Sequence, residues 1–378
     1  MSKVFPIDIV YMWVDGADPK FAEQKALWQK KLGVMPNNDN HISRYIDNQE
    51  LRYSLRSVAT YAPWINKIYI VTNGQVPSWL DTTHPKIRIV THAKIMPADS
   101  LPTFNSRAIE SCIADIPELS EHFLLANDDC FISTPVEPKF FFDRKGRAIV
   151  RFLKAKFTAE KLSRSLYQRS IAYTLNLISQ RYQKVGDWQP HHNIDAYRKS
   201  CYLDCINDFK DEFAALRRQK FRSLSVQRII FALYAYVKNK AIMRIVNHSS
   251  YSLFHADSLY IDISSIAVMA QQIFAKTPHL LCINDEPYVK DAQRDDYKTL
   301  LGVMFPNAQP WEKLPPTPVD DEQLRKIVTE LQKTRQAVRK AKIYRFIHWF
   351  FSVKNYRHNR KKHKVLTILG IRLSRRIE

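Results

Sequence analysis

Two adjacent carboxylates follow a hydrophobic run in the first third of the chain. Asp128 and Asp129 come directly after Asn127, which follows the run Phe123 to Ala126. Successive side chains at a strand end diverge, so one carboxylate can bind a cation while the other holds a loop or accepts a proton. A hard cation such as Mg²⁺ takes one or two carboxylates together with substrate phosphate oxygens. An Asp pair after a strand is also typical of a turn or helix cap, so both interpretations stay open here.

Polar residues follow other hydrophobic runs in the same way. Asp15 stands before Gly16, and Asp-Gly is a common turn pair. Asn284 and Asp285 follow Cys282-Ile283, where they either hold a metal or a donor molecule or form an ordinary turn before Glu286-Pro287.

A third group of polar residues lies at Pro190-His191-His192-Asn193-Ile194-Asp195, followed by Arg198 and Lys199. A helix that begins near Asp195 would place two phosphate-binding cations one turn beyond the histidines. The alternative is a surface loop that runs into a helix. Zinc is disfavoured because no thiolate or further histidine stands at ligand spacing.

The elements that must position these residues alternate between strands and helices. Strands are expected at Ile7–Val14, Lys67–Thr72, Ile87–Thr91 and His122–Ala126, with helices near Arg44–Tyr61 and Ser106–Asp115. This order predicts an α/β fold with a mostly parallel sheet flanked by helices. Ligands of such sheets bind beyond the carboxyl ends of the strands, so the polar residues after the strands are expected to share one crevice. They are Asp15, Asn73, His92 and Asn127 to Asp129.

The composition excludes several classes of protein. The chain has only seven glycines and contains neither GxGxxG nor GxxxxGK[ST]. A glycine-rich loop that binds phosphate through its backbone, as in Rossmann or P-loop proteins, is therefore not expected, and any phosphate must be bound by side chains or a metal. Five cysteines with no CxxC pair are expected to be reduced thiols of a cytosolic protein. The first residues enter a strand-like run directly, which predicts no secretory signal, and no apolar run is long enough to suggest a spanning helix.

The rest of the chain divides into an insertion, a linker and a tail. Residues 150–245 are expected to be a mainly helical insertion, after which strand signals return at Ser258–Ile266 and Leu280–Asp285. The sequence predicts a catalytic domain over 1–305, a proline-rich linker over 306–319 and a basic helical tail over 320–378.

The basic charge is concentrated in the tail. From Lys333 to Glu378 there are 15 Lys and Arg against one Glu, a net +14 of the chain's formal +21. Aromatic and basic residues mix over Lys342 to Lys354, which favours binding to an anionic membrane surface. A solvated face and a nucleic-acid site are the alternatives. A nucleic-acid-binding protein is disfavoured because the excess charge is terminal and the core motifs are acidic.

Four segments of the chain resemble, in order, the four conserved regions of the Stealth family of bacterial capsule phosphotransferases and the eukaryotic N-acetylglucosamine-1-phosphotransferase. The first is Ile7 to Gly16, and the second runs from Arg44 through Glu50-Leu51-Arg52-Tyr53 and Ala62-Pro63-Trp64-Ile65 to Asp129. The third is His191 to Lys199 and the fourth is Ile283 to Glu286. Most of residues 7–287 is covered, and the tail lies outside the resemblance.

The resemblance implies a Rossmann-like (GT-A-like) domain that transfers a hexose-1-phosphate or N-acetylhexosamine-1-phosphate. The donor would be a UDP-sugar, the acceptor a capsular polysaccharide hydroxyl, and UMP would leave as a phosphodiester forms. Such a transfer needs positioning and charge neutralisation more than covalent catalysis, and Mg²⁺ (or Mn²⁺) would be the cofactor. The implied location is cytoplasmic, peripheral on the inner face of the cytoplasmic membrane.

The residues and the resemblance together give a set of candidate site residues. The proton acceptor is either His192 or an Asp, and His192 is favoured over His191 as the family histidine. Arg52 and Arg56 would share a helix face and repel each other unless an anion lies between them. The catalytic candidates are Asp15, Asp128 and His192; the substrate and phosphate ligands are Arg44, Arg52, Asn73, Asn105, Ser106, His191, Arg198, Lys199 and Asn284; the metal ligands are Asp128, Asp129 and Asp285.

The main rival is a metal-dependent glycosyltransferase, which would use the same carboxylates but transfer the sugar and release UDP. A nucleic-acid-binding protein is the third interpretation, suggested by the net charge alone.

Overall fold

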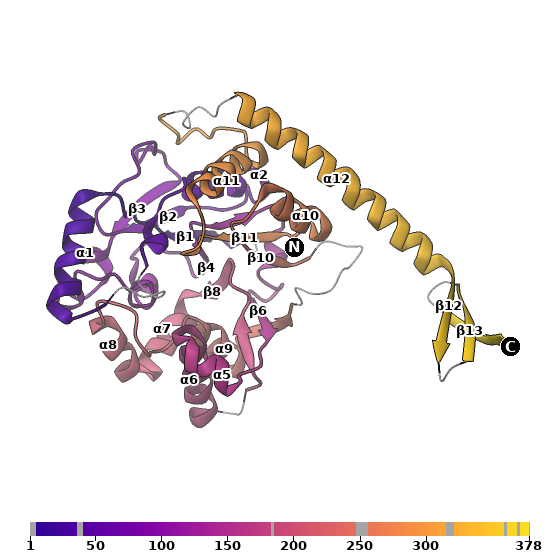
Figure 1. The fold of residues 1–378 in the computed structure, drawn as a ribbon. Coiled ribbons are helices and arrows are strands. Elements are labelled where there is room, and N and C mark those ends of the chain that lie inside the picture. The colour runs from indigo at the N-terminus through magenta and orange to yellow at the C-terminus, as the bar shows by residue number, and fades with distance from the viewer. Residues whose placement is uncertain are drawn as a thin grey trace.

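The computed structural model describes residues 5–35, 41–182, 185–246, 256–314, 321–358, 361–368 and 371–377, and gives the backbone alone from residue 344 on. Figure 1 shows an α/β body from which one long helix projects.

The central sheet has the strand order β3-β2-β1-β4-β8. β1 (Ile7–Met12), β2 (Ile68–Thr72), β3 (Ile87–Thr91) and β4 (His122–Asn127) are parallel, and β8 (Asp195–Arg198) runs antiparallel to β4. The first four match the expected strands within two residues. β1, β2 and β4 are almost wholly buried, as hydrophobic runs covered on both faces must be. The predicted α/β class with a mostly parallel sheet is confirmed.

Helices cover this sheet. α1 is stopped at both ends by its sequence: Asp18 accepts from the backbone N–H of Phe21, and Gly33 ends the helix at φ 62°. The helices of the body are α1 (Pro19–Leu32), α2 (Glu50–Tyr61), α3 (His92–Ile95), α4 (Ser106–Glu110), α5 (Ala159–Arg164), α6 (Leu166–Arg181), α7 (Lys199–Asp208), α8 (Lys210–Arg218), α9 (Ile229–Val237), α10 (Ile266–Lys276) and α11 (Asp291–Met304). Short 3₁₀ turns occupy Ile42–Tyr45, Ala98–Ser100, Ile113–Asp115 and Pro138–Phe140.

Helices α5 to α9 make up most of the regular structure of the insertion at 150–245, as the sequence predicted, but the insertion also contains strands. β6 (Ala148–Lys154) pairs with β7 (Trp188–Pro190) and β9 (Ala241–Ile245), and β8 joins the central sheet. β7 and β8 span three and four residues, which is too short for a period-two pattern to be recognised.

A second sheet, formed by β10 (Ser258–Asp262), β11 (Leu280–Asn284) and β5 (Cys130–Ile132), adjoins the central sheet. β10 and β11 are parallel, and β11 pairs antiparallel with β5, which follows β4 directly. α11 packs against both α2 and α10, so the C-terminal part of the body covers an N-terminal helix (Figure 1).

The stretch expected to be a linker is partly docked on the body. Glu312 forms a bridge with Leu80, the backbone N–H of Asp81 donates to the Trp311 carbonyl, and Trp311 is buried. Residues 306–314 of the predicted linker are therefore docked on the body, with Trp311 to Lys313 bound to residues 79–81. The remaining residues of that linker, 315–319, lie outside the described part of the chain.

α12 (Asp321–Phe350) forms the first part of the predicted helical tail and packs along α10 and α11. Beyond it the predicted helical tail is wrong: residues 351–377 form the antiparallel strands β12 (Phe351–His358), β13 (Lys361–Ile368) and β14 (Ile371–Ile377). Val365, Thr367, Ile368 and Ile371 are β-branched and favour strands.

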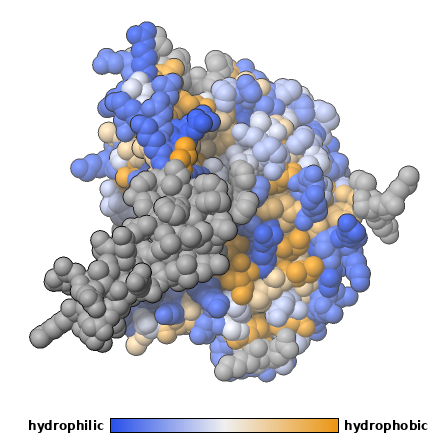
Figure 2. All heavy atoms as spheres, turned by 90° about the vertical axis from the view of Figure 1, so that its right-hand side faces the viewer, coloured by the Kyte–Doolittle hydropathy of each residue, from blue (hydrophilic) through white to orange (hydrophobic). Residues whose placement is uncertain are grey.

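The face that carries α12 is uneven in polarity. Figure 2 shows apolar patches on this face between hydrophilic areas. Among the described residues, no helix combines the length and apolar composition that crossing a bilayer requires.

Candidate active site

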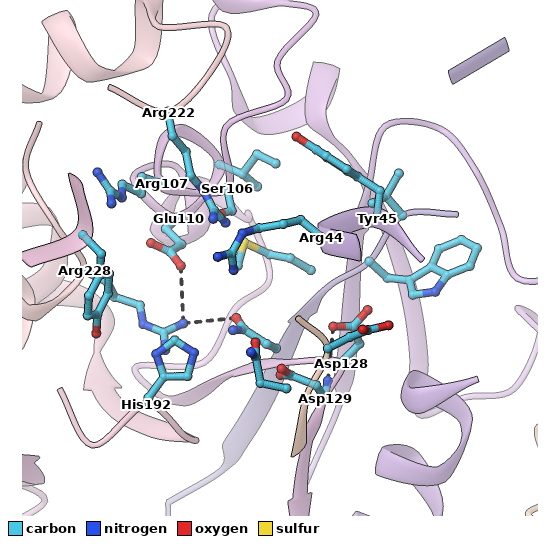
Figure 3. Close-up of a pocket in the computed structure, with 18 of the residues that line it drawn as sticks. Arg44, Tyr45, Ser106, Arg107, Glu110, Asp128, Asp129, His192, Arg222 and Arg228 are labelled. Atoms are coloured by element: carbon cyan, nitrogen blue, oxygen red, sulfur yellow. Dashed lines mark hydrogen bonds and ion pairs between the residues drawn. The ribbon is translucent and has the colours of Figure 1, made fainter. Parts of the chain in front are cut away.

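A cavity of about 590 Å³ lies beyond the carboxyl ends of the parallel strands. Met12 is paired with Val71 on one side and with Asn127 on the other, so the segments after β1, β2 and β4 meet at one edge. Figure 3 shows side chains from both halves of the body converging there. The candidate residues that line the cavity are Arg44, Asn73, Ser106, Asp128, Asp129, His191, His192, Asn284 and Asp285.

Asp128 and Asp129 have different surroundings although they are adjacent. Asp128 Oδ1 accepts a hydrogen bond from the backbone N–H of Asp129 at 3.1 Å. The two oxygens of Asp129 each accept from a thiol, Cys130 Sγ and Cys282 Sγ, both at 3.5 Å. The thiols therefore hold Asp129, and Asp128 is the better placed to bind a ligand in the cavity.

The carboxylates on this wall of the cavity are poorly compensated. Burial raises the pKa of Asp128 well above its ordinary value, and the charges of Asp129 and Asp47 raise it further. Burial likewise raises the pKa of Glu50 well above its usual range, with Asp128 and Asp47 adding to the effect. A bound cation would reverse these shifts.

Asn48 has one buried polar atom without a hydrogen-bond partner among the described residues. Its Nδ2 donates to Glu50 Oε1 at 2.8 Å and to Asp285 Oδ2 at 3.3 Å. Its Oδ1 is buried and has no hydrogen-bond partner in the described part of the chain. An amide oxygen without a partner beside carboxylates is a ligand that Mg²⁺ or Mn²⁺ accepts. The residues present therefore fit a hard divalent cation.

The opposite wall is basic. Arg228, at the start of α9, lies between two carboxylates: its Nη1 is 3.4 Å from Glu110 Oε1 and its Nη2 is 3.2 Å from Asp195 Oδ2. Nη1 also donates to Asn127 Oδ1 at 3.4 Å. Burial alone would lower the pKa of Arg228, but Glu110 and Asp195 raise it above the usual value.

Arg222 differs from Arg228 in having other cations for neighbours. It donates to Ser106 Oγ at 2.8 Å. Burial, together with repulsion by Arg44 and Arg107, lowers its pKa to about 10. Figure 3 shows the guanidinium groups of Arg222 and Arg44 pointing toward one another. Guanidinium groups that converge in this way favour an anion between them.

His191 and His192 have different surroundings although they are adjacent in sequence. His191 is buried, with Nδ1 3.1 Å from Ser258 Oγ and Nε2 2.9 Å from Asp195 Oδ1, so both ring nitrogens have protein partners. His192 has φ 55° and packs edge-on against Tyr260, with ring centroids 4.9 Å apart.

Burial, reinforced by Arg228, lowers the pKa of His192 to about 3, so the ring is neutral at pH 7. The geometry favours His192 over His191 as the group that meets a substrate, because His192 is exposed to the cavity and neutral.

Arg198 and Lys199 do not lie in the cavity, contrary to the prediction. Residues 195–198 form β8 instead of a helix start, and Arg198 pairs with His122 at the opposite end of β4 from Asp128. Arg198 forms an ion pair with Glu121 at 2.9 Å, and Lys199 Nζ donates to the Ile116 carbonyl at 2.8 Å. A strand carries the chain away from the site, whereas the predicted helix would have stayed beside it.

Three more candidates also lie outside the cavity lining. Arg52 is buried and forms an ion pair with Glu312. Asn105 caps α4 and donates toward the Gln219 and Phe221 carbonyls, so it supports the segment that carries Arg222. The Asp15 carboxylate accepts from the Ala17 N–H in a tight turn, as its alternative interpretation predicted.

Asp285 and Asn284 line the cavity but have protein partners. Asp285 receives two hydrogen bonds from Arg294, at 2.7 and 3.0 Å, so its charge is already balanced. Asn284 Nδ2 donates to Glu286 Oε1 at 2.7 Å.

Sequence reasoning missed the main basic residues of the site. Arg222 and Arg228 both lie in the loop between α8 and α9, inside the region that was predicted only to be a helical insertion. Glu110 stands in the second conserved segment but received no role. One signal could have indicated these arginines. The segments that follow the strands carry several carboxylates, and a buried site with that much negative charge requires cationic residues from elsewhere in the chain.

Two family models match the chain. The one described as "Stealth protein CR1, conserved region 1" matches residues 5–33, and "Stealth protein CR2, conserved region 2" matches residues 44–150.

Several curated relatives cover most of the chain. Exopolysaccharide phosphotransferase CpsY of Mycobacterium tuberculosis is 34% identical over 325 residues, which are 82% of this chain and 59% of CpsY. Capsular polysaccharide phosphotransferase LcbA of Neisseria meningitidis is 30% identical over 310 residues, 80% of this chain and 82% of LcbA. The chain thus spans less than two thirds of the length of CpsY.

Among solved structures, the galactosyltransferase LgtC in complex with donor and acceptor sugar analogues aligns with a TM-score of 0.38 and 11% identity. The alignment covers 85% of this chain and 99% of that chain.

Proposed function

Since the chain belongs to the Stealth family, we propose that it transfers a sugar-1-phosphate from a UDP-sugar to a hydroxyl of a growing capsular polysaccharide. The sugar is a hexose or an N-acetylhexosamine, and UMP is the leaving group. The observation that carries this proposal is the cavity itself, which is lined by under-compensated carboxylates, by converging arginines and by the neutral His192. The similarity to CpsY and LcbA, which are named as an exopolysaccharide and a capsular polysaccharide phosphotransferase, supports it.

The acidic wall would hold the cofactor. Asp128 would hold Mg²⁺ (or Mn²⁺) together with Glu50, and Asn48 Oδ1 is a further oxygen available near these carboxylates. The ion would supply positive charge to the diphosphate. Asp129 and Asp285 have thiol and arginine partners, so they support this wall and are poorer ligands for Mg²⁺ than the sequence suggested.

The basic wall would bind the donor phosphates. Arg44 and Arg222 converge on the same space, and an anion placed there relieves the repulsion that lowers the Arg222 pKa. Arg228 is already balanced by Glu110 and Asp195, so it orients the wall more than it binds phosphate.

His192 would accept the acceptor proton. The acceptor oxygen forms a bond to phosphorus, the bond from phosphorus to the UMP oxygen breaks, and its electron pair leaves with UMP. The hydroxyl proton passes to His192, which is neutral and able to take it. Burial and Arg228 lower the His192 pKa, and a bound diphosphate offsets the arginine charge, so the ring becomes more basic when the donor is present. Asp15 is disfavoured because its carboxylate is held in a turn.

The C-terminal segment would bring the enzyme to an anionic membrane surface, with the protein cytoplasmic and peripheral on the inner face of the cytoplasmic membrane. A cavity of about 1220 Å³ between α10, α11 and α12 supports this. Its walls are apolar, with Ile273, Phe274 and Met304 among them, while α12 contributes Arg335 and Arg339. An apolar groove with cations along it suits anionic lipids.

The product identifies the reaction. Purified protein is incubated with a panel of UDP-sugars, Mg²⁺ and capsule oligosaccharides, and the nucleotide product and the phosphorus NMR spectrum of the saccharide are recorded. UMP with a new phosphodiester signal supports the proposal. UDP with no phosphorus in the saccharide would show the rival glycosyltransferase reaction instead.

A further inference from the structure

Two buried cysteines face each other beside the acidic wall. All five cysteines of the chain are free and buried. Cys130 on β5 is the direct partner of Cys282 on β11 in an antiparallel pair. Backbone hydrogen bonds from Ile283 to Asp129 and from Ser133 to His279 lie on either side of this pair. It is therefore a non-hydrogen-bonded pair, in which opposite side chains approach most closely.

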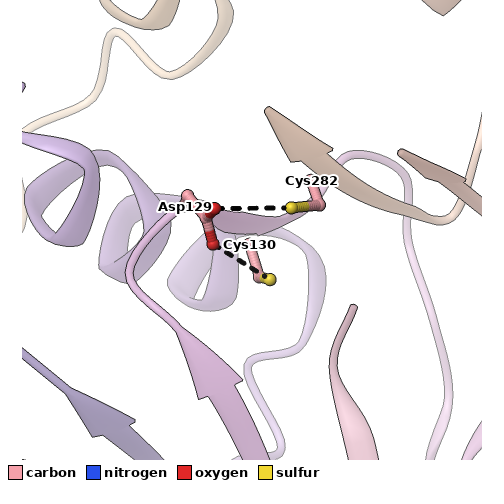
Figure 4. Close-up of side chains that lie close together, drawn as sticks. All are labelled: Asp129, Cys130 and Cys282. Carbon is pink, nitrogen blue, oxygen red and sulfur yellow. Dashed lines mark hydrogen bonds between the residues drawn. The ribbon is translucent and has the colours of Figure 1, made fainter. Parts of the chain in front are cut away.

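Asp129 completes a set of three ligand atoms. Its oxygens lie 3.5 Å from Cys130 Sγ and 3.5 Å from Cys282 Sγ, and the three ligand atoms are all within 4.8 Å of one another (Figure 4). In a tetrahedral zinc site with Zn–S of about 2.3 Å and Zn–O of about 2.1 Å, sulfur and oxygen ligands are about 3.6 Å apart. The spacing seen between sulfur and oxygen is thus the spacing of zinc ligands.

The charges also suit a cation at this place. Two neutral thiols and one carboxylate carry the same net charge as two thiolates, one carboxylate and one divalent cation. Exchange of two thiol protons for the ion therefore adds no net charge to a buried cluster, which avoids the main cost of burying an ion. Burial raises the pKa of Cys282 well above its ordinary value, so the thiol keeps its proton until a cation replaces it.

We propose that Asp129, Cys130 and Cys282 bind one thiophilic divalent cation of the Zn²⁺ class. The two thiol protons pass to solvent, no oxidation occurs, and a water from the cavity side, where Asp129 is exposed, supplies the fourth ligand. The site is distinct from the hard-cation site at Asp128, because thiolate ligands select soft metals and carboxylate or amide oxygens select hard ones.

The bound ion would tie β5 and β11 together and fix the orientation of Asp129 next to Asp128. This inference stands on the cluster alone and does not rest on the proposed transfer reaction. Among the described residues, no other group of His, Cys, Asp and Glu side chains meets the same spacing.

The test measures metal content and spectrum on the full chain. Metal is first removed from the protein with a chelator, and the protein is then equilibrated with buffered Zn²⁺. The amount of zinc bound per chain is measured by inductively coupled plasma mass spectrometry. We expect one zinc per wild-type chain and its loss in Cys130→Ser and Cys282→Ser. Cys112→Ser, which changes a buried thiol outside the cluster, should keep the ion.

A second measurement does not depend on variants that fold. Co²⁺ added to the wild-type protein should give the near-ultraviolet charge-transfer band of cobalt thiolates, together with the visible bands of tetrahedral cobalt. The proposal is overturned if the wild-type chain takes up no zinc and shows no such band, or if both serine variants, shown to be folded by circular dichroism, retain zinc. In that case the thiols serve only as hydrogen-bond donors to Asp129.

Discussion

Arg56 and Glu312 form a two-point ion pair across 256 residues of chain: Nε lies 2.7 Å from Oε1, and Nη2 lies 2.7 Å from Oε2. The two side chains are 3% and 2% exposed. Arg52 adds a third contact to the same carboxylate at 2.7 Å. The anion between these two arginines is thus Glu312 of the chain itself, and it locks α2, which carries Glu50, against the segment that follows α11.

Glu312→Gln should lower the free energy of unfolding by about 3–5 kcal/mol, because it leaves two buried guanidinium groups without a counter-charge. Denaturant unfolding measures the change. Glu118→Gln is the matched control, since Glu118 pairs with Lys67 at the surface and its loss should leave the unfolding midpoint nearly unchanged. Equal midpoints for the two variants would show that the buried pair contributes nothing.

The same pair gives the stability a pH dependence of known sign. Burial raises the pKa of Glu312, but Arg56 and Arg52 outweigh it and hold the pKa below its ordinary value. The stabilisation is then complete above the unfolded-state pKa, about 4.3, and is lost as pH falls through the lower folded-state pKa. The wild-type advantage over Glu312→Gln should therefore shrink in acid and be constant from pH 6 to 8.

The central strands could be predicted from the sequence because each is a buried hydrophobic run followed by polar residues. His122 to Ala126 followed by Asn127 is the clearest case, and the structure ends β4 at Asn127. β8 could not be predicted, because a four-residue strand has no period of its own and exists only through pairing with β4. The docking of Trp311 was hidden for a similar reason: a tertiary contact decides it, against the local signal of the prolines.

The acidic half of the candidate site could be predicted and the basic half could not. Asp128 and Asn73 stand at strand ends, where chain topology alone brings residues together. Arg222 and Arg228 reach the cavity from a loop about 100 residues later, and no spacing rule links them to Asp128. Arg198 was wrongly predicted to bind phosphate because it is basic and lies close to His192 in sequence, which does not make the two side chains close in space.

Asp128→Asn should abolish transfer while stabilising the cation-free protein. The Asp128 pKa is raised by burial and by neighbouring carboxylates, so the folded state binds the proton more tightly than the unfolded state. That stabilisation is complete below the unfolded-state pKa of about 3.9 and is lost as pH rises through the folded-state pKa. At pH 7 the buried carboxylate therefore destabilises the folded protein, and replacement by the neutral Asn removes this destabilisation.

Thermal melts with a chelator, run at pH 4 and pH 7, test this expectation. The Tm of Asp128→Asn should exceed that of the wild type at pH 7, and the difference should be small at pH 4. Added Mg²⁺ should raise the Tm of the wild type only. A variant less stable than the wild type at pH 7 in chelator would contradict the reading of Asp128 as an under-compensated charge.

Arg222→Gln should raise KM for the UDP-sugar by about 10–100-fold, because it removes a charge-assisted contact worth about 1.5–3 kcal/mol with the donor phosphates. Arg198→Gln is the matched control, since Arg198 was predicted to bind phosphate but is ion-paired with Glu121 outside the cavity. Steady-state kinetics with varied donor separates the two. If Arg198→Gln raises KM as much as Arg222→Gln, the assignment of the basic wall is wrong.

His192→Ala should lower kcat by about 10²–10⁴-fold with little change in Tm, as removal of a general base does. His191→Ala should instead lower Tm, because Asp195 and Ser258 lose buried hydrogen bonds. Since the His192 pKa is about 3, the pH profile of kcat/KM should show no inflection near 6.5. An inflection there that disappears in His192→Ala would mean that the ring titrates as an ordinary histidine.

A chain that ends at residue 343 should lose its binding to anionic vesicles and keep its transfer activity on soluble oligosaccharides. The removed segment carries ten Lys and Arg against one Glu, and each basic residue near an anionic surface contributes about 1 kcal/mol. The active-site cavity is lined entirely by residues 12–286, and α12 up to residue 343 still provides the groove against α10.

Flotation with vesicles of phosphatidylglycerol, compared with phosphatidylcholine and repeated at high salt, measures the loss. The full chain should bind the anionic vesicles only, and less so in salt, because exposed charges are screened beyond about 10 Å at 0.1 M. Binding of the shortened chain that equals that of the full chain would assign the membrane contact to the groove between α10, α11 and α12, and would remove the tail from the proposal.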